Sequence, residues 1–478
     1  MRCFVCSLTR LIFRAIDTDT AFSCTGIKES CVKRLLSKIC TIEMMNFTGV
    51  QGFSSDLLAD AIVPEERGLR HVLLAAFGSL GFSINTTDVS ESNAPKEKNI
   101  SPENSASISL AKHSLAKRIS AAETAPANSA EHARMLMSLP RADRVCIVLI
   151  DGLGSHQIAQ RLGHVPTIRS LAGAEGISSV TSIAPSTTVA ALTSFATAAY
   201  PGQTSMLSYS LHNRKNHSTF DLISFRNSPV CAKNWQTYPT LFERLTREDA
   251  GQCVLIVDPK HKDSGLTMAA WRGVTSTYAR RLEDRVDLAV RELKTGKKLA
   301  YLYWGNLDHE GHVYGVNSQQ WLSELEYTDA CFAQLLRSLP RGTLVILTAD
   351  HGMVEDREKV DIAHVPYLNR GVEAIAGEER GFHVYCAEEE AEPLAERWRD
   401  YFSERAWVLT RQQLAASDLF GPMTSHAYEA IGNVICFARE SLGVVDSRAL
   451  SPHALKLRGV HGSLTAEEMH VPWIVEVV

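Results

Sequence analysis

Apolar runs of strand length recur through the part of the chain that follows residue 140. They cover residues 144–150, 176–184, 251–258, 299–308 and 343–350. These runs are continuous rather than alternating, which is typical of central strands that are covered on both faces. Stretches with helical spacing also occur, at 239–248, 278–295 and 318–338. The pattern predicts an α/β fold, with a doubly wound, mostly parallel central sheet and helices on both faces.

The chain divides into segments of different character. Residues 1–43 are an N-terminal extension without a clear pattern, and 44–86 carry helical spacing, which predicts a helical N-terminal segment. Residues 87–140 are rich in Ser, Asn, Ala, Lys and Glu, which predicts a disordered linker. We expect one compact domain over 141–478. Within it, the shorter mixed elements of 365–450 suit an inserted cap or subdomain.

Composition excludes several classes of protein. The chain has 478 residues, of which 45% are hydrophobic, enough for one large core or two domains. A formal net charge of −5 gives no electrostatic support for binding nucleic acid or a membrane surface. No run of 18 apolar residues occurs, so no transmembrane helix is predicted. The oligomeric state leaves no signal in the sequence.

The cysteines and the first residues bear on the compartment. There are 11 cysteines, and those after residue 140 lie mostly inside apolar runs, which is typical of buried free thiols in a reducing compartment. Residues 1–15 combine an early positive charge with a short apolar stretch, but Arg10 interrupts it and no clear cleavage site follows. We therefore expect a cytoplasmic protein, with secretion as the alternative.

Three acidic residues stand at the ends of apolar runs. Asp151 follows 144–150, and Asp308 and Asp350 close the runs that contain them. Open α/β sheets bind ligands at the carboxyl ends of their strands, so these acids are expected at the ligand-binding edge. Carboxylates there suit a hard or borderline cation. Taken alone, Asp151 fits a helix N-cap as well.

Three histidines extend this set of acids. Asp308 and His312 are four residues apart, which places both on one face of a helix, where they can hold one metal ion. His351 directly follows Asp350, whereas His461 stands alone, and a lone histidine is usually a surface or core residue. Each motif is weak by itself. Their joint occurrence predicts a metal-dependent hydrolase acting on a phosphoryl group, and the mixture of His and Asp favours zinc over manganese or iron.

A hydroxyl nucleophile is offered by the segment Ser186-Thr187-Thr188, which precedes an Ala-rich helical stretch. A hydroxyl at a helix N-terminus lies beside unpaired N–H groups and the positive end of the dipole, a place that phosphate favours. Metal coordination can lower the pKa of such a hydroxyl. The same residues also suit a helix cap, so the segment alone does not choose among the three hydroxyls.

Together these segments resemble the alkaline phosphatase superfamily, and within it the type I phosphodiesterase and nucleotide pyrophosphatase branch. The resemblance spans roughly residues 142 to 475 and rests on motifs in the family order: D-G, P-x-x-T, D-x-x-x-H, D-H-G and H-G. It implies the alkaline phosphatase-like fold and two zinc-type ions. One site would use Asp308, His312 and His461; the other would use Asp151, Asp350 and His351.

The resemblance also implies the mechanism. Counting back from Thr197, which stands for the Thr of the family's T-G, places the nucleophile at Thr188, facing the metals, with Thr187 and Ser186 as fallback candidates. Thr188 would form a phospho-threonine intermediate that a metal-activated water then releases. The expected partner is a small-molecule phosphate ester, with a nucleotide-like diester or pyrophosphate as the default.

This chain departs from the family pattern after the nucleophile. Residues 189–191 are Val-Ala-Ala, so an expected Asn contact to phosphate is missing, and Lys233, Asn234 and Ser264 are the candidates to replace it. Substrate preference therefore stays open. A phosphomonoesterase, phosphonate hydrolase or phosphomutase of the same superfamily is the alternative. A metal-free binding protein on the same fold is the alternative from another class.

Overall fold

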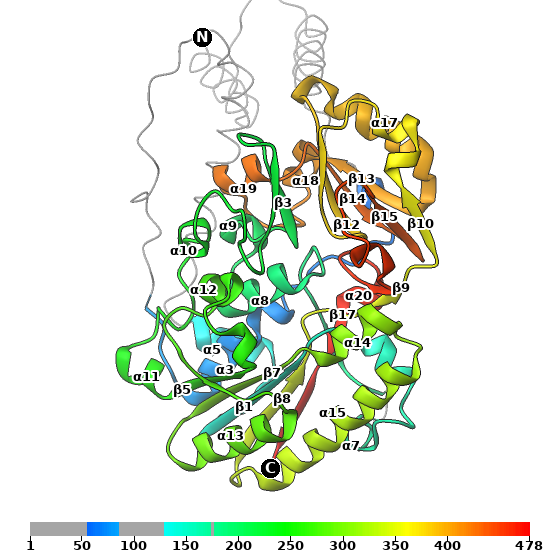
Figure 1. Ribbon diagram of the computed structural model, residues 1–478. Coiled ribbons are helices and arrows are strands. Elements are labelled where there is room, and N and C mark those ends of the chain that lie inside the picture. Colours follow the sequence, from blue (N-terminus) through cyan, green and yellow to red (C-terminus); the bar gives the residue numbers. More distant parts are fainter. Residues whose placement is uncertain (1–54, 86–128, 174–175) are drawn as a thin grey trace, which may run out of the picture. The chain divides into compact units, whose positions relative to one another are not determined.

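The computed structural model describes residues 55–85, 129–173 and 176–478 (Figure 1). The predicted extension at 1–43 and the 87–128 part of the predicted linker lie outside these ranges. No helix within them is long and apolar enough to cross a membrane.

A six-stranded sheet forms the centre of the fold. Its strand order is β18-β8-β1-β7-β5-β6, and every neighbouring pair is parallel except β18 with β8. The strands are β1 (Arg144–Ile150), β5 (Cys253–Val257), β6 (Thr275–Tyr278), β7 (Leu299–Trp304), β8 (Thr343–Thr348) and β18 (Ile474–Val477). In β5, β7 and β8 every residue is buried, as continuous apolar runs require.

The strand register brings distant sequence motifs to one edge of the sheet. Ile150 pairs with Trp304, and Leu149 pairs with Thr348. The carboxyl ends of β1, β7 and β8 therefore lie side by side, and the residues that follow these three strands share one end of the sheet.

Helices lie on both sides of this sheet, as expected (Figure 1). On one side α13 (Leu282–Lys294) packs against β5, β7 and α15 (Gln319–Ser338). Elsewhere α3 (Val72–Leu80) packs against β1, α5 (Ser129–Leu136) and α8 (Thr188–Thr197).

The predicted linker is corrected at its end. Residues 129–136 form α5 rather than disordered chain, because Ala130, Ala133 and Met137 bury their side chains in the same core as β1. Gly78 permits the contact with α3, since a Cβ there would lie 2.1 Å from the Ala130 carbonyl oxygen. Because the residues where α3 and α5 cross are small, the composition of this segment gives no sign of a buried helix.

Two other predicted elements are shifted. Of 176–184, only β2 (Ser179–Thr181) is a strand, and it pairs antiparallel with β17 (His470–Pro472) outside the central sheet, because so short a run cannot fill a central position. The helix expected at 239–248 begins only at α11 (Arg247–Gly251), where the Thr246 hydroxyl accepts the N–H of Asp249 as its cap.

A second, antiparallel sheet is built from residues 374–438. Its order is β11-β12-β14-β13, with β11 (Ala374–Gly377), β12 (Gly381–Tyr385), β13 (Ala406–Thr410) and β14 (Val434–Ala438). Helix α17 (Ala391–Phe402) packs on it and buries Leu394, Trp398 and Phe402 in a core distinct from that of the central sheet. The turn between β11 and β12 contributes a residue to the site described next.

Candidate metal centre

The three predicted acids meet at the carboxyl edge of the central sheet. Asp151 follows β1 directly, and Asp350 lies two residues after β8. Asp308 stands in the first turn of α14 (Asn306–Tyr314), not on the strand itself. Gly152, at φ 74°, turns the chain between them, and a Cβ there would come within 3.0 Å of the Asp308 Cβ. The glycine of the Asp-Gly motif thus lets two carboxylates approach each other.

The histidines point one nitrogen each at these carboxylates. The His312 Nε2 lies 3.3 Å from Asp308, one helical turn away. The His351 Nε2 lies 3.4 Å from Asp151 and 3.6 Å from Asp350. The His461 Nε2 lies 3.9 Å from Asp308 Oδ1, and its ring stacks on that of His351 with centroids 3.6 Å apart.

The opposite nitrogen of each ring fixes the tautomer. Nδ1 of His312 is 2.7 Å from the Gly459 carbonyl, Nδ1 of His461 is 2.8 Å from the Ser186 carbonyl, and Nδ1 of His351 is 3.0 Å from the Gly352 carbonyl. A carbonyl can only accept, so each Nδ1 carries the proton and donates it. Each Nε2 then presents a lone pair to the carboxylates, which is the arrangement of metal-ligating histidines.

At this edge of the sheet the lone pairs of imidazole nitrogens and carboxylate oxygens face one another, with no hydrogen atom between them. One oxygen each of Asp151, Asp308 and Asp350 is buried without a hydrogen-bond partner among the described residues. Ligand atoms gather within 4.8 Å of one another in two groups: Asp151, Asp350 and His351, and Asp308, His351 and His461. The donor set fits divalent cations. His312 is not a member of either group, but it contacts Asp308, which belongs to the group with His351 and His461.

The pKa shifts of Asp151 and His461 also favour a bound cation. Burial, reinforced by the neighbouring Asp350 and Asp308, raises the pKa of Asp151 well above its usual range. Burial also lowers the pKa of His461 well below its ordinary value, with His351 and His312 adding to the effect. A negative charge on Asp151 is therefore unfavourable in the bare protein, and a bound cation would supply the opposite charge that this buried carboxylate lacks.

Of the three candidate hydroxyls, the structure places that of Thr188 beside the ligands. Its Oγ1 lies 3.1 Å from Nε2 of His351, and Thr188 is the first residue of α8. The Ser186 hydroxyl is buried and donates to the Ser463 carbonyl. Thr187, almost fully buried, is the N-cap residue of α8.

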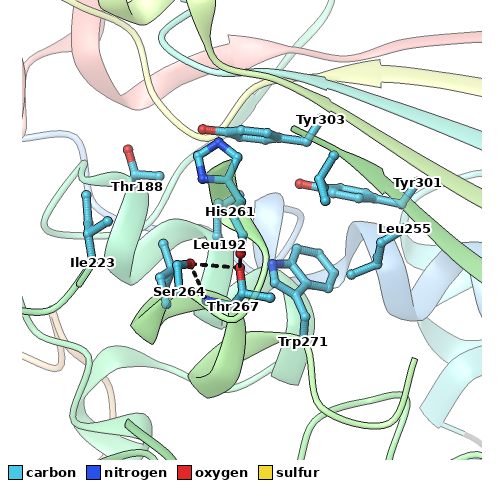
Figure 2. A pocket seen from close by; sticks show the side chains of 12 residues that line it. Thr188, Leu192, Ile223, Leu255, His261, Ser264, Thr267, Trp271, Tyr301 and Tyr303 are labelled. Atoms are coloured by element: carbon cyan, nitrogen blue, oxygen red, sulfur yellow. Dashed lines mark hydrogen bonds between the residues drawn. The ribbon is translucent and has the colours of Figure 1, made fainter. Parts of the chain in front are cut away.

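A pocket opens beside Thr188. Its cavity volume is about 70 Å³, and Figure 2 shows Thr188 at one end with Trp271 and Tyr301 at the other. Ser264 lines it, whereas Lys233 and Asn234 are exposed and do not belong to its lining. Among the proposed replacements for the missing Asn, only Ser264 therefore lies in this pocket.

Sequence reasoning missed several residues that shape the site. The Tyr303 hydroxyl donates to Asp151 from inside the apolar run of β7. Glu378, in the β11–β12 turn, places Oε2 3.4 Å from Nδ1 of His461. Arg380, which directly precedes β12 in the same turn, makes a fully buried ion pair with Glu468. The tyrosine within an apolar run could have been noticed, but no spacing or motif connects residues 378–380 with the ligands.

The comparisons with known proteins fit this geometry. Residues 145–464 match the family model described as type I phosphodiesterase / nucleotide pyrophosphatase. No curated protein sequence matches the chain.

Solved structures share the fold at low sequence identity. Murine ectonucleotide pyrophosphatase / phosphodiesterase 5 is 16% identical, with a TM-score of 0.55 over 70% of this chain and 88% of its own. The human protein of that name is 17% identical, with a TM-score of 0.54 over 70% and 87%. Phosphonoacetate hydrolase from Sinorhizobium meliloti 1021 is 16% identical, with a TM-score of 0.53 over 70% and 90%.

The family match covers well over half of the chain and includes all seven of the predicted site residues. The structural similarity independently shows the α/β fold with its mostly parallel sheet. The chain therefore belongs to the type I phosphodiesterase / nucleotide pyrophosphatase family of the alkaline phosphatase superfamily, a family of phosphoester hydrolases.

Proposed function

We propose that this protein cleaves phosphodiester or pyrophosphate bonds with Thr188 as the nucleophile. The observation that carries the proposal is the place of the Thr188 hydroxyl, 3.1 Å from Nε2 of His351 at the edge of the ligand cluster. We further propose that the six carboxylate and imidazole side chains hold two divalent ions, with zinc favoured by the mixture of His and Asp.

The side chains of this protein then have separate tasks. The ions, when bound, would supply positive charge that lowers the pKa of the Thr188 hydroxyl and neutralises the phosphoryl oxygens. The hydroxyl oxygen forms a bond to phosphorus while the bond to the leaving oxygen breaks in line with it. The free N–H groups at the start of α8 face the same phosphoryl group, where the helix dipole favours negative charge. Water then forms a bond to phosphorus while the bond from phosphorus to Thr188 Oγ1 breaks, so the phosphate product leaves and Oγ1 regains a proton.

A diester substrate is favoured over a monoester by the charges around the site. Glu378 lies beside His461, and the nearby Arg380 is committed to Glu468 in a buried pair. Neither Glu378 nor the paired Arg380 supplies a cation for the second charge of a monoester dianion, whereas a diester monoanion has no second charge to place there. A related structure supports the assignment of the nucleophile: the murine phosphodiesterase 5 solved with AMP is an inactive threonine-to-alanine variant.

The test compares bis-p-nitrophenyl phosphate with p-nitrophenyl phosphate, with zinc added. We expect the wild type to prefer the diester, and Thr188→Ala to lose turnover while keeping its metal content by elemental analysis. Thr193→Ala is the matched control, because its buried hydroxyl has no hydrogen-bond partner among the described residues. Full turnover in Thr188→Ala would refute the nucleophile.

Other outcomes separate the alternatives. A preference for the monoester, or phosphate release from phosphonoacetate without diester cleavage, would move the protein to the phosphomonoesterase or phosphonate hydrolase class. Absence of both bound metal and turnover would favour a binding protein.

A further inference from the structure

The pocket beside Thr188 has a defined end and a defined orientation. Leu192, one helical turn after Thr188 on α8, forms part of its wall, and Leu255, Trp271 and Tyr301 close the end away from the nucleophile (Figure 2). The rings of Trp271 and Tyr301 pack with centroids 4.6 Å apart, and Phe195 backs both. The closed end is thus a rigid aromatic surface.

The position of Thr188 decides which part of a substrate can enter. In an in-line displacement the leaving oxygen departs on the side of phosphorus opposite the attacking hydroxyl. Thr188 itself lines the pocket, so a group in the pocket lies on the nucleophile's side of phosphorus. The pocket therefore receives the substituent that stays on phosphorus and not the one that leaves.

No ionised side chain lines this pocket. Its described lining contains no Lys, Arg, Asp or Glu. Burial lowers the pKa of His261 to about 4, so this imidazole is neutral at neutral pH. A charged substituent would lose its hydration here without gaining a counter-charge, which is strongly unfavourable.

Three hydroxyls of the lining are occupied, whereas the ring nitrogens of His261 make no hydrogen bond to a described residue. The Ser264 hydroxyl donates to Thr267 Oγ1, the Thr267 hydroxyl donates to the His261 carbonyl, and the Tyr303 hydroxyl donates to Asp151. These groups add little capacity for binding a polyhydroxylated group such as a ribose, because their donors are already used.

Two donors are left over at the closed end. The Tyr301 hydroxyl is buried without a hydrogen-bond partner among the described residues, and its side chain is 1% exposed. The indole N–H of Trp271 likewise makes no hydrogen bond to a described residue, and Figure 2 shows it turned toward Thr267 inside the pocket. Buried donors are normally paired, so the free hydroxyl of Tyr301, with the unpaired indole N–H of Trp271 in the same pocket, points to an acceptor supplied from outside.

We infer that this pocket selects phosphodiesters whose retained substituent is an uncharged, mainly apolar ring carrying a hydrogen-bond acceptor, which Tyr301 and Trp271 bind. The inference rests on the proposed function, because it assigns the substrate class of that same site. It separates this protein from an enzyme that selects nucleosides, whose several polar groups would meet a mostly apolar lining.

The test uses p-nitrophenyl diesters that share one leaving group and differ in the retained substituent: methyl, phenyl, 4-acetylphenyl, 4-carboxyphenyl and thymidine-5′-yl. Release of p-nitrophenol gives kcat/KM for each. We expect phenyl to exceed methyl by about tenfold or more, since a hydrophobic pocket discriminates at about this level for each group it buries. The 4-acetyl group should add about fivefold, as one neutral hydrogen bond does. The 4-carboxyphenyl diester, similar in shape but charged, should fall at least tenfold below 4-acetylphenyl.

Variants assign the acceptor contact. In Tyr301→Phe and Trp271→Phe the ratio of kcat/KM for 4-acetylphenyl to that for phenyl should fall toward one, through KM rather than kcat. Tyr367→Phe, which alters an exposed tyrosine of the second sheet's region, is the matched control and should keep the wild-type ratio.

The outcomes distinguish this inference from the proposed function. Equal kcat/KM across the series, or a preference for thymidine over 4-acetylphenyl, would overturn the pocket's role while leaving diester hydrolysis intact. If the ratio of kcat/KM for 4-acetylphenyl to that for phenyl were unchanged in both Tyr301→Phe and Trp271→Phe, the two donors would not bind the acceptor of the retained substituent. Failure of every diester to release p-nitrophenol would refute the proposed function, and this inference with it.

Discussion

Glu468→Gln tests how the second sheet is connected to the loop that carries His461, a candidate metal ligand. Glu468 and Arg380 are both fully buried, and two guanidinium nitrogens each donate to a different carboxylate oxygen at 2.8 Å. Glu468 also accepts the backbone N–H of Ser463 at 3.0 Å, two residues after His461. The substitution keeps the shape of the side chain but leaves the Arg380 charge buried and uncompensated.

The expected loss of stability follows from that geometry. Removing one partner of a buried ion pair costs about 3–5 kcal/mol, and we expect the lower end because Gln retains one acceptor oxygen. With an m-value of about 3 kcal/mol per molar urea, the unfolding midpoint should fall by about 1 M. The affinity for zinc should fall as well, since the Ser463 contact that holds the His461 loop is weakened.

The assay is urea unfolding followed by circular dichroism, with metal affinity measured by titration. Glu358→Gln is the control, because its pair with Arg405 is 50% and 37% exposed and should contribute under about 1 kcal/mol. The double variant Arg380→Met with Glu468→Met should recover much of the stability, since it buries no charge. A loss under about 1 kcal/mol in Glu468→Gln would refute the reasoning.

Three further predictions follow from the site and the second sheet. Asp151→Asn should lose bound zinc and more than about 100-fold in kcat/KM, because changing even an outer-shell partner of a metal ligand costs about 10–100-fold; retention of metal by elemental analysis would contradict the ligand assignment. Gly152→Ala should lower stability by about 1–2 kcal/mol from its φ of 74° and lower activity by pushing on Asp308, whereas unchanged unfolding and kinetics would contradict the close approach. Burial lowers the pKa of His383, in β12, to about 3, so its contribution to stability is present above the unfolded-state value of 6.5 and is lost as pH falls from there toward 3, by about 1.4 kcal/mol per pH unit. In His383→Leu, urea unfolding at pH 6.5 and 5 should show a free energy of unfolding that changes less with pH than in the wild type, because one proton fewer is taken up on unfolding. An unchanged slope would show that His383 is not the group responsible.

The sequence by itself determined the main strands and the acids that close them, which are the candidate metal ligands. Strand β1 occupies the predicted 144–150, and α15 begins and ends within a residue of the predicted 318–338. Such elements are legible because a continuous apolar run or a helical spacing is a local property of consecutive residues. The acids that close these runs share one edge because parallel strands carry their carboxyl ends to the same side.

Tertiary structure alone decided which surroundings those residues receive. Glu378 and Arg380 reach the His461 loop from a hairpin turn about 80 residues earlier, and the tautomers of His312 and His461 depend on carbonyls of other segments. The unpaired hydroxyl of Tyr301 and the helix at 129–136 likewise depend on what packs against them. Contacts between distant segments leave no periodicity in the chain, because each depends on how whole elements pack and not on the spacing of neighbouring residues.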